Sequence, residues 1–148
     1  MKPRLDAFSP GEPRPDVILE IVFERGLLFL ALRNIGEQPA VGVQCRFDRV
    51  LSGLEGTKDV SALPLFRRLA FLGPGREITV FLDSTAAYFG ARGPARLGVD
   101  IRYRDRKGRR FETTIKHDLS VYRELGYIDP APGAALCASE PQVRSDWR

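Results

Sequence analysis

The chain has 148 residues, of which 43% are hydrophobic and 28% charged, and its formal net charge is +4. A chain of this length forms one domain whose core needs no metal or disulfide, and two cysteines are too few for a disulfide scaffold. The N-terminus lacks an apolar signal core, and no run approaches about 18 apolar residues, so we expect a cytoplasmic protein without a membrane span. The mild positive charge favours acidic partners or anionic surfaces.

Two apolar, β-branched segments, residues 16–23 and 27–33, predict the first two strands. Arg25-Gly26 between them fits a two-residue hairpin turn. This turn predicts three inward pairs and an acidic outer face: Phe23 with Leu28, Ile21 with Leu30 and Leu19 with Leu32 point inward, and Glu20 and Glu24 point outward.

Asn34, Gly36 and Pro39 predict a corner, since Asn and Gly tolerate left-handed backbone and Pro cannot join a central ladder. The corner is expected to carry the chain into a second sheet packed on the first. Residues 40–47 resume the strand pattern, and Cys45 among them is predicted to be a core thiol. The alternation predicts one shared face made of Val41, Val43, Cys45 and Phe47.

The second half of the chain continues in short segments separated by turn signals. Residues 48–64 predict a loop or short edge strands, and Pro74-Gly75 predicts a type II turn before a strand at 77–83. Ser84 is expected to cap a short helical turn. Residues 96–104 and 109–116 predict a final hairpin.

About seven short strands without a long helical period predict an all-β fold, an Ig-like two-sheet antiparallel sandwich. Four prolines in residues 1–15 predict an extended N-terminal arm. The predicted organisation is therefore this arm, a sandwich at residues 16–118, and a C-terminal docking tail at residues 119–148.

Three motifs follow one another along the chain: Leu32, Asn34, Gly36, Pro39, Ala40 and Val43; then Leu72, Pro74, Gly75 and Glu77; then Tyr103, Asp105, Gly108, Arg109 and Phe111. In this order and spacing they resemble bacterial Ig-like sandwich domains of the cell-adhesion-related, CARDB-like type. The resemblance covers residues 16–118. It implies a binding or spacer module and carries over no catalytic residue.

The last hairpin concentrates positive charge. Residues 100–116 contain seven Lys or Arg and three Asp or Glu, so the net charge of this segment equals the net charge of the whole chain, +4. The residues expected to face the core fix how the two strands pair. This pairing predicts two inward pairs, Tyr103 with Phe111 and Ile101 with Thr113, and two outward pairs, Arg102 with Glu112 and Arg104 with Arg110. This register leaves a three-residue loop at 106–108, with Gly108 in the left-handed conformation.

The basic hairpin has two interpretations. It is either a patch for an acidic partner or anionic membrane surface, or a charged edge that blocks strand-on-strand aggregation. Nucleic acid is disfavoured as a partner, because the aromatics nearest the patch are predicted to point into the core.

Catalytic chemistry is not indicated by the sequence. No nucleophile, phosphate-loop, dinucleotide or metal-ligand motif is present, so we expect a non-enzymatic protein without a cofactor. His117 and Asp118 would point to opposite faces of one strand and could not form a dyad. His117 is expected at a strand end or bonded to local backbone.

The tail begins with Leu119, Tyr122 and Leu125 at helical spacing, and Trp147 near its end is the only tryptophan. Tryptophan is frequent among interface hot spots, so the tail is predicted to dock on a partner. The partner-binding residues are predicted to be Arg102, Arg104, Arg106, Lys107, Arg109, Arg110, Tyr122, Tyr127 and Trp147.

The leading hypothesis is a non-catalytic protein-interaction module. It would be an accessory or stabilising subunit of a larger bacterial assembly, including one peripheral to a membrane complex on its cytoplasmic face. The alternative is a small-ligand or carbohydrate-binding β-sandwich domain. That alternative requires an exposed aromatic platform, for which the candidates are Tyr88, Phe89, Tyr122, Tyr127 and Trp147.

Overall fold

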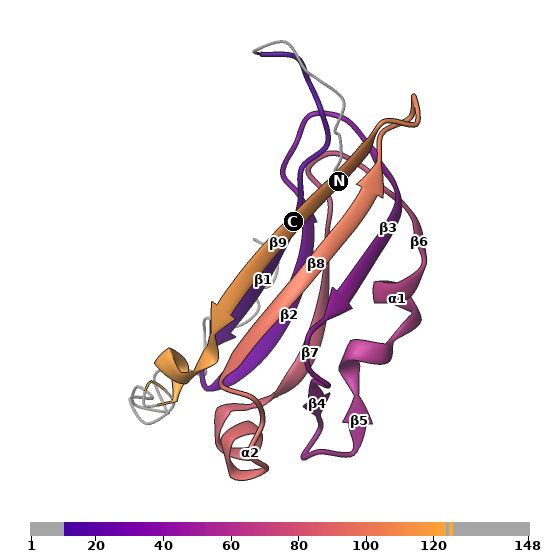
Figure 1. The fold of residues 1–148 in the computed structure, drawn as a ribbon. Helices are drawn as coiled ribbons and strands as arrows, with labels where there is room; N and C mark the ends of the chain where they lie inside the picture. The colour runs from indigo at the N-terminus through magenta and orange to yellow at the C-terminus, as the bar shows by residue number, and fades with distance from the viewer. Residues whose placement is uncertain (1–10, 124, 126–148) are drawn as a thin grey trace.

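The computed structural model describes residues 11–123 and Leu125. Within these residues two antiparallel sheets pack face to face, so the predicted all-β, Ig-like sandwich is confirmed (Figure 1). Sheet A has the strand order β1-β2-β7: β1 is Val17–Glu24, β2 is Leu27–Asn34 and β7 is Glu77–Ser84. Sheet B has the order β6-β3-β8-β9: β6 is Leu69–Leu72, β3 is Ala40–Phe47, β8 is Arg96–Arg104 and β9 is Arg110–Asp118.

Short elements fill the connections between the sheets. β4 (Ser52–Gly53) and β5 (Lys58–Asp59) form a small ribbon within the predicted loop or edge-strand region, followed by η1 (Val60–Ala62) and α1 (Pro64–Arg67). The predicted helical turn is α2 (Thr85–Gly90), and Ser84 Oγ caps it by accepting a hydrogen bond from Ala87 N at 3.0 Å. η2 (Leu119–Tyr122) follows β9.

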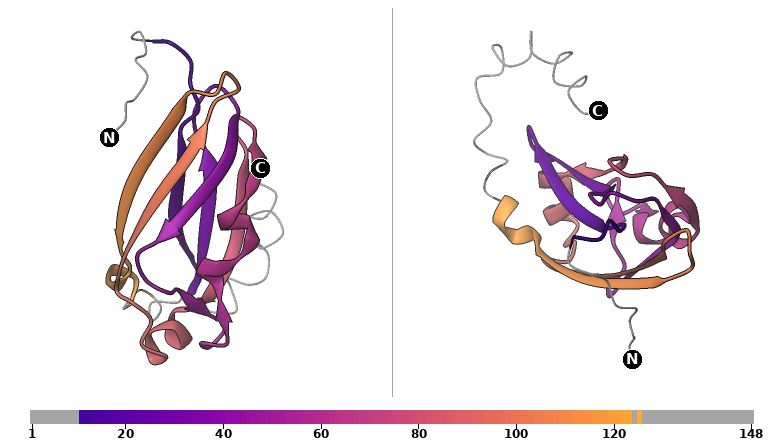
Figure 2. Two further views of the ribbon diagram at one scale, coloured as in Figure 1. Left: turned by 45° about the vertical axis from the view of Figure 1, so that its right-hand side comes forward. Right: turned by 90° about the horizontal axis from the view of Figure 1, so that it is seen from above.

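The core lies between the facing sides of the two sheets, which form separate layers when seen from above (Figure 2). Residues from both sheets are at most 1% exposed: Leu19, Leu30 and Leu32 from sheet A, and Val43, Val99 and Ile101 from sheet B. Burial of each such side chain stabilises the fold by roughly 1.5–3 kcal/mol. Cys45, 7% exposed, is the predicted core thiol.

The first hairpin has the predicted register, with Phe23 opposite Leu28. Arg25 and Gly26 both have positive φ, 54° and 80°, as a type I′ turn requires. A two-residue turn of this type fixes which residues oppose one another. The inward pairs predicted from the turn are therefore the observed pairs.

The predicted corner after β2 does carry the chain from sheet A to sheet B. Asn34 at its start is only 1% exposed, and its side chain makes four hydrogen bonds to backbone groups. The backbone also passes very close to the N-terminal segment here. A Cβ on Gly36 would lie 2.3 Å from the carbonyl oxygen of Arg14, so no side chain fits at this position.

The predicted face of β3 is wrong at Val41. Gly42 has a φ of +64° and forms a bulge, which shifts the register between β3 and β8. As a result, Ala40 opposes the buried Leu72, while Val41 opposes the exposed Phe71. Val41 therefore lies on the outer face of sheet B, opposite to Val43.

One long side of the sandwich is closed where β1 and β9 lie side by side. His117 Nε2 on β9 donates a hydrogen bond to the Leu19 carbonyl oxygen on β1, at 2.8 Å. His117 is the penultimate residue of β9, so the predicted strand-end position is correct, and its backbone partner is distant in sequence and not local. Asp118 accepts a hydrogen bond from Ser120 N at 3.0 Å and so begins η2.

Candidate interaction surface

The β8–β9 hairpin has the predicted register along its whole length. Tyr103 opposes Phe111, and their rings stack with centroids 5.4 Å apart and an interplanar angle of 10°. Tyr103 is 4% exposed, and Phe111 packs against the core. These two rings therefore belong to the interior, and the outer face of the hairpin is formed by its charged residues.

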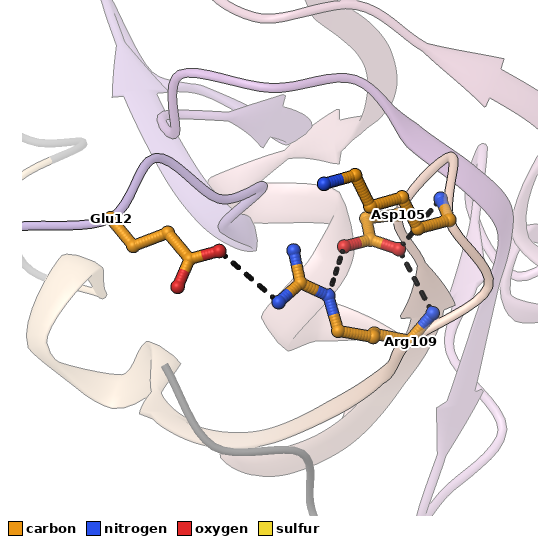
Figure 3. Close-up of polar contacts among 4 residues, drawn as sticks. Glu12, Asp105 and Arg109 are labelled. Carbon is orange, nitrogen blue, oxygen red and sulfur yellow. Dashed lines mark hydrogen bonds and ion pairs between the residues drawn. The ribbon is translucent and has the colours of Figure 1, made fainter. Parts of the chain in front are cut away.

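Asp105 holds the loop of the hairpin in a single shape. Its Oδ1 accepts hydrogen bonds from the backbone N–H groups of Lys107 and Arg109, both at 2.9 Å. Its Oδ2 accepts a third from Arg109 Nε at 2.9 Å (Figure 3). Gly108, with a φ of +88°, completes the predicted three-residue loop. The loop tip is thus pre-organised by a buried carboxylate.

The same contacts determine the protonation of Asp105. Burial by itself would raise the pKa of this carboxyl group. The hydrogen bonds from Arg109 and Lys107 and the charge of the Arg109 guanidinium outweigh burial, and the pKa of Asp105 lies below its ordinary value. Asp105 is therefore ionised at neutral pH, as its role in holding the loop requires.

Arg109 differs from the other cations predicted to bind a partner. Besides Asp105, its guanidinium contacts Glu12 of the N-terminal segment, with Nη1 3.2 Å from Oε2 (Figure 3). Only 25% of its side chain is exposed. Arg109 thus joins the loop to the N-terminal segment, and we assign it to the support of the surface.

Arg102 is also partly neutralised, because its Nε lies 3.5 Å from Glu112 Oε2 on the neighbouring strand. The remaining cations of the hairpin are exposed and form no ion pair with any residue in the described part of the chain. Arg96 and Lys116 lie toward the end of the hairpin away from the loop. Those around the loop are Arg104, Arg106, Lys107 and Arg110, and we refer to these four as the basic tip. The loop that carries two of them projects beyond the body of the sandwich (Figure 1).

The bulge in β3 helps to place one residue of the basic tip. A Cβ on Gly42 would lie 2.9 Å from Arg104 Nη2, so the guanidinium occupies the space that a side chain at Gly42 would fill. Arg104 also lies directly opposite Arg110, as predicted. Two like charges are therefore held together on the outer face of sheet B.

Only the first residues of the predicted docking tail lie within the described part of the chain. Tyr122 packs against the core and stacks on Phe23, with ring centroids 5.8 Å apart. Leu119 is fully buried, so the core continues past the predicted sandwich boundary at residue 118. Tyr127, Trp147 and Cys137 lie outside the described residues.

The aromatics considered for a carbohydrate platform are mostly engaged elsewhere. Tyr88 is 1% exposed, and its hydroxyl donates a hydrogen bond to the Pro94 carbonyl oxygen at 2.6 Å. Phe89 packs edge-on against Tyr88, and Arg123 lies 4.7 Å from the centre of its ring. The Tyr88 ring is therefore not available to a sugar, and Arg123 covers one face of the Phe89 ring.

Two observations on the described residues bear on metal binding and thiol chemistry. Among residues 11–123 and Leu125, no three His, Cys, Asp or Glu side chains are arranged to hold a metal ion. Burial raises the pKa of the Cys45 thiol to about 12, which keeps it in the unreactive thiol form. No helix within the described range is long and apolar enough to cross a membrane.

Fold and surface together define the class of this protein: an all-β sandwich domain that presents a rigid, basic hairpin. The model of a family described as a domain of unknown function, DUF8453, matches residues 10–123, and the chain belongs to this family. No curated protein matches the chain. No solved structure matches it either. The resemblance to CARDB-like domains stays a prediction.

Proposed function

We propose that the domain is a non-catalytic protein-interaction module, an accessory subunit that binds an acidic surface of a larger assembly through the basic tip. The observation that carries this proposal is the set of four exposed cations without an ion pair among the described residues, two on the loop held by Asp105 and two on the strand ends beside it. A pre-organised loop loses little conformational entropy on binding. Charge complementarity then favours association with an acidic partner.

The position of Arg104 supports docking over edge protection. Charges that prevent strand addition are needed on a free edge. Arg104 lies on β8, an interior strand between β3 and β9. The edge strand β9 already lies beside β1, where His117 bonds to Leu19. Holding Arg104 opposite Arg110 costs about 0.2–1 kcal/mol, which a purely structural role would not require.

A protein partner fits the surface better than nucleic acid does. Proteins that bind single strands combine basic grooves with several exposed aromatic rings. Here the rings nearest the basic tip, Tyr103 and Phe111, are turned into the core, and the exposed ring of Phe71 is two strands away from Arg104. An anionic membrane could bind the same four cations, so the test below also measures binding to anionic vesicles.

The proposal is tested by comparing two double variants that each remove two positive charges. Arg104→Ser with Arg110→Ser changes the basic tip, and Arg49→Ser with Lys58→Ser changes two exposed cations elsewhere. We expect an acidic protein to co-purify from native cells with the wild type and with the control. Its recovery should fall about tenfold with the basic-tip variant at low salt, and the difference between this variant and the wild type should shrink as the salt concentration is raised.

Equal recovery with both variants would overturn the proposal. So would a basic-tip variant that loses only sedimentation with vesicles of about 30% phosphatidylserine while every protein contact persists, because membrane charge would then be the target.

A further inference from the structure

One row of outward side chains crosses all four strands of sheet B. Phe71 on β6 opposes Val41 on β3, Val41 opposes Arg104 on β8, and Arg104 opposes Arg110 on β9. Directly opposed residues share a face of the sheet, so these four side chains lie in a line on the outer face. We refer to them as the transverse row. Figure 1 shows β6 and β9 at opposite sides of this sheet, and since the row begins with Phe71 on β6 and ends with Arg110 on β9, it has an apolar end and a cationic end.

Phe71 is exposed by 55%, and single exposed apolar residues are common on protein surfaces. Phe71 is distinctive because of the residues with which it is aligned across the sheet. The next rows of the same face are polar: Gln44, Arg102 and Glu112, followed by Arg46, Asp100 and Thr114. The exposed ring and its apolar neighbour Val41 therefore stand at the one row that also holds two arginines without an ion pair among the described residues.

The spacing of the row sets the length of what it can recognise. Neighbouring strands lie about 4.8 Å apart, so the row spans about 14 Å. An apolar group seated between Phe71 and Val41 would be about 7 Å from the Arg104 position and about 12 Å from the Arg110 position. In an extended chain, residues two and four positions onward lie about 6.7 and 13 Å away and share one face.

We propose that the transverse row recognises a short, extended acidic segment of a protein partner. The segment has an apolar residue followed by acidic residues at the second and fourth positions after it. The apolar side chain rests on Phe71 and Val41, and the two carboxylates meet Arg104 and Arg110. This inference rests on the proposed function, to which it adds the apolar half of the surface and the spacing of the bound motif.

The bulge at Gly42 is what makes this surface possible. In a regular strand Val41 would face the core together with Val43. The bulge turns Val41 outward next to Phe71 and leaves room at Gly42 for the Arg104 guanidinium. One irregularity in β3 thus places both the apolar half and one cation of the row.

A peptide probe tests the inference on the full chain labelled with ¹⁵N. The probe has nine residues, one Phe followed by Asp at the second and fourth positions, with Gly and Ser elsewhere. We expect amide shifts at the row on β6, β3, β8 and β9. Affinity should fall about fivefold or more when Asn replaces both Asp, when Ser replaces the Phe, or when the Asp residues move to the first and third positions.

Protein variants separate this inference from the proposed function. Phe71→Ser changes an exposed side chain, and a thermal melt verifies that the variant is folded. It should weaken the probe about as much as Arg104→Ser does, whereas Arg49→Ser should leave binding unchanged. Shifts on another face, no shifts at millimolar probe, or equal binding of the respaced peptide would overturn the inference.

The native partner supplies the final distinction. If Phe71→Ser retains it and the Arg104/Arg110 double variant loses it, the transverse row is wrong and the basic tip stands. If both variants retain it, both proposals fail. A Phe71→Ser variant that instead abolishes self-association, measured by sedimentation, would identify a second copy of the chain as the occupant and overturn the acidic segment.

Discussion

The side-chain amide of Asn34 donates a hydrogen bond to the Leu72 carbonyl oxygen at 3.1 Å, and so ties the end of sheet A to the end of sheet B. The same amide donates to the Gln38 carbonyl at 2.8 Å. Its oxygen accepts from Asp16 N at 3.1 Å and Gly36 N at 2.9 Å. One side chain therefore satisfies four backbone groups at the corner between the sheets.

Asn34→Ala should destabilise the domain by about 2–5 kcal/mol, because buried backbone groups lose their partner and cannot all reach water. Urea unfolding monitored by fluorescence measures the change. Gln38→Ala is the control: its backbone carbonyl is used but its side chain is exposed, so its effect should be within about 0.5 kcal/mol. Equal losses for the two variants would refute the role given to Asn34.

Gly42→Ala should weaken binding of acidic probes more than it lowers stability. Alanine at a φ of +64° costs roughly 1 kcal/mol in backbone strain. The new Cβ would also displace the flexible end of Arg104, which lies 2.9 Å away. Gly75→Ala is the matched control, since Gly75 has a φ of +75° but a Cβ there would meet no atom within 4 Å. Both variants should lose similar stability, and only Gly42→Ala should lose affinity in the peptide titration.

Strand registers are the part of this fold most accessible from sequence. Arg25-Gly26 and the loop ending at Gly108 have few conformations, so each turn fixes the pairing of the strands beside it. The alignment of Arg104 with Arg110 follows from that rule alone. The cationic part of the surface could therefore be predicted from the amino-acid sequence.

The apolar half of the surface could not be found this way. Val41 and Val43 alternate like residues of one face, and they diverge because of the bulge at Gly42. A glycine inside a strand is a signal for a bulge, but it does not fix which neighbouring side chain turns outward. The hydrogen bond that Arg109 donates to Glu12 joins residues 97 positions apart in the sequence, so it could be found only from the folded structure. α1 has four residues, too few for a helical period.

Arg104→Ser should leave stability unchanged or raise it by about 0.2–1 kcal/mol, because it removes a like-charge pair with Arg110. Arg102→Ser should act in the opposite direction, since it breaks the ion pair with Glu112, although at this exposed site the loss should be below about 1 kcal/mol. Urea unfolding at low salt measures both. The difference between the two variants should shrink in about 1 M NaCl, and a stability loss for Arg104→Ser would show that Arg104 has a structural role instead.

Asp105 should make the stability of the domain sensitive to acid. Its pKa is depressed in the folded state, so its contribution is fully present above the unfolded value of about 3.9 and is lost as the pH falls through the lower folded value. Asp105→Asn keeps an acceptor for the loop N–H groups but loses the charge that Arg109 faces. It should cost about 1–3 kcal/mol at pH 7 and lose less stability than the wild type on acidification.

Urea unfolding of both proteins between pH 7 and pH 2.5 measures this difference. Thr114→Ala serves as the control, because it breaks an exposed hydrogen bond to Asp100 on the same hairpin without removing a charge. Its pH dependence should follow that of the wild type. If Asp105→Asn also follows the wild type, the loop is held by its backbone turn alone, and the rigidity that supports the basic tip would have another origin.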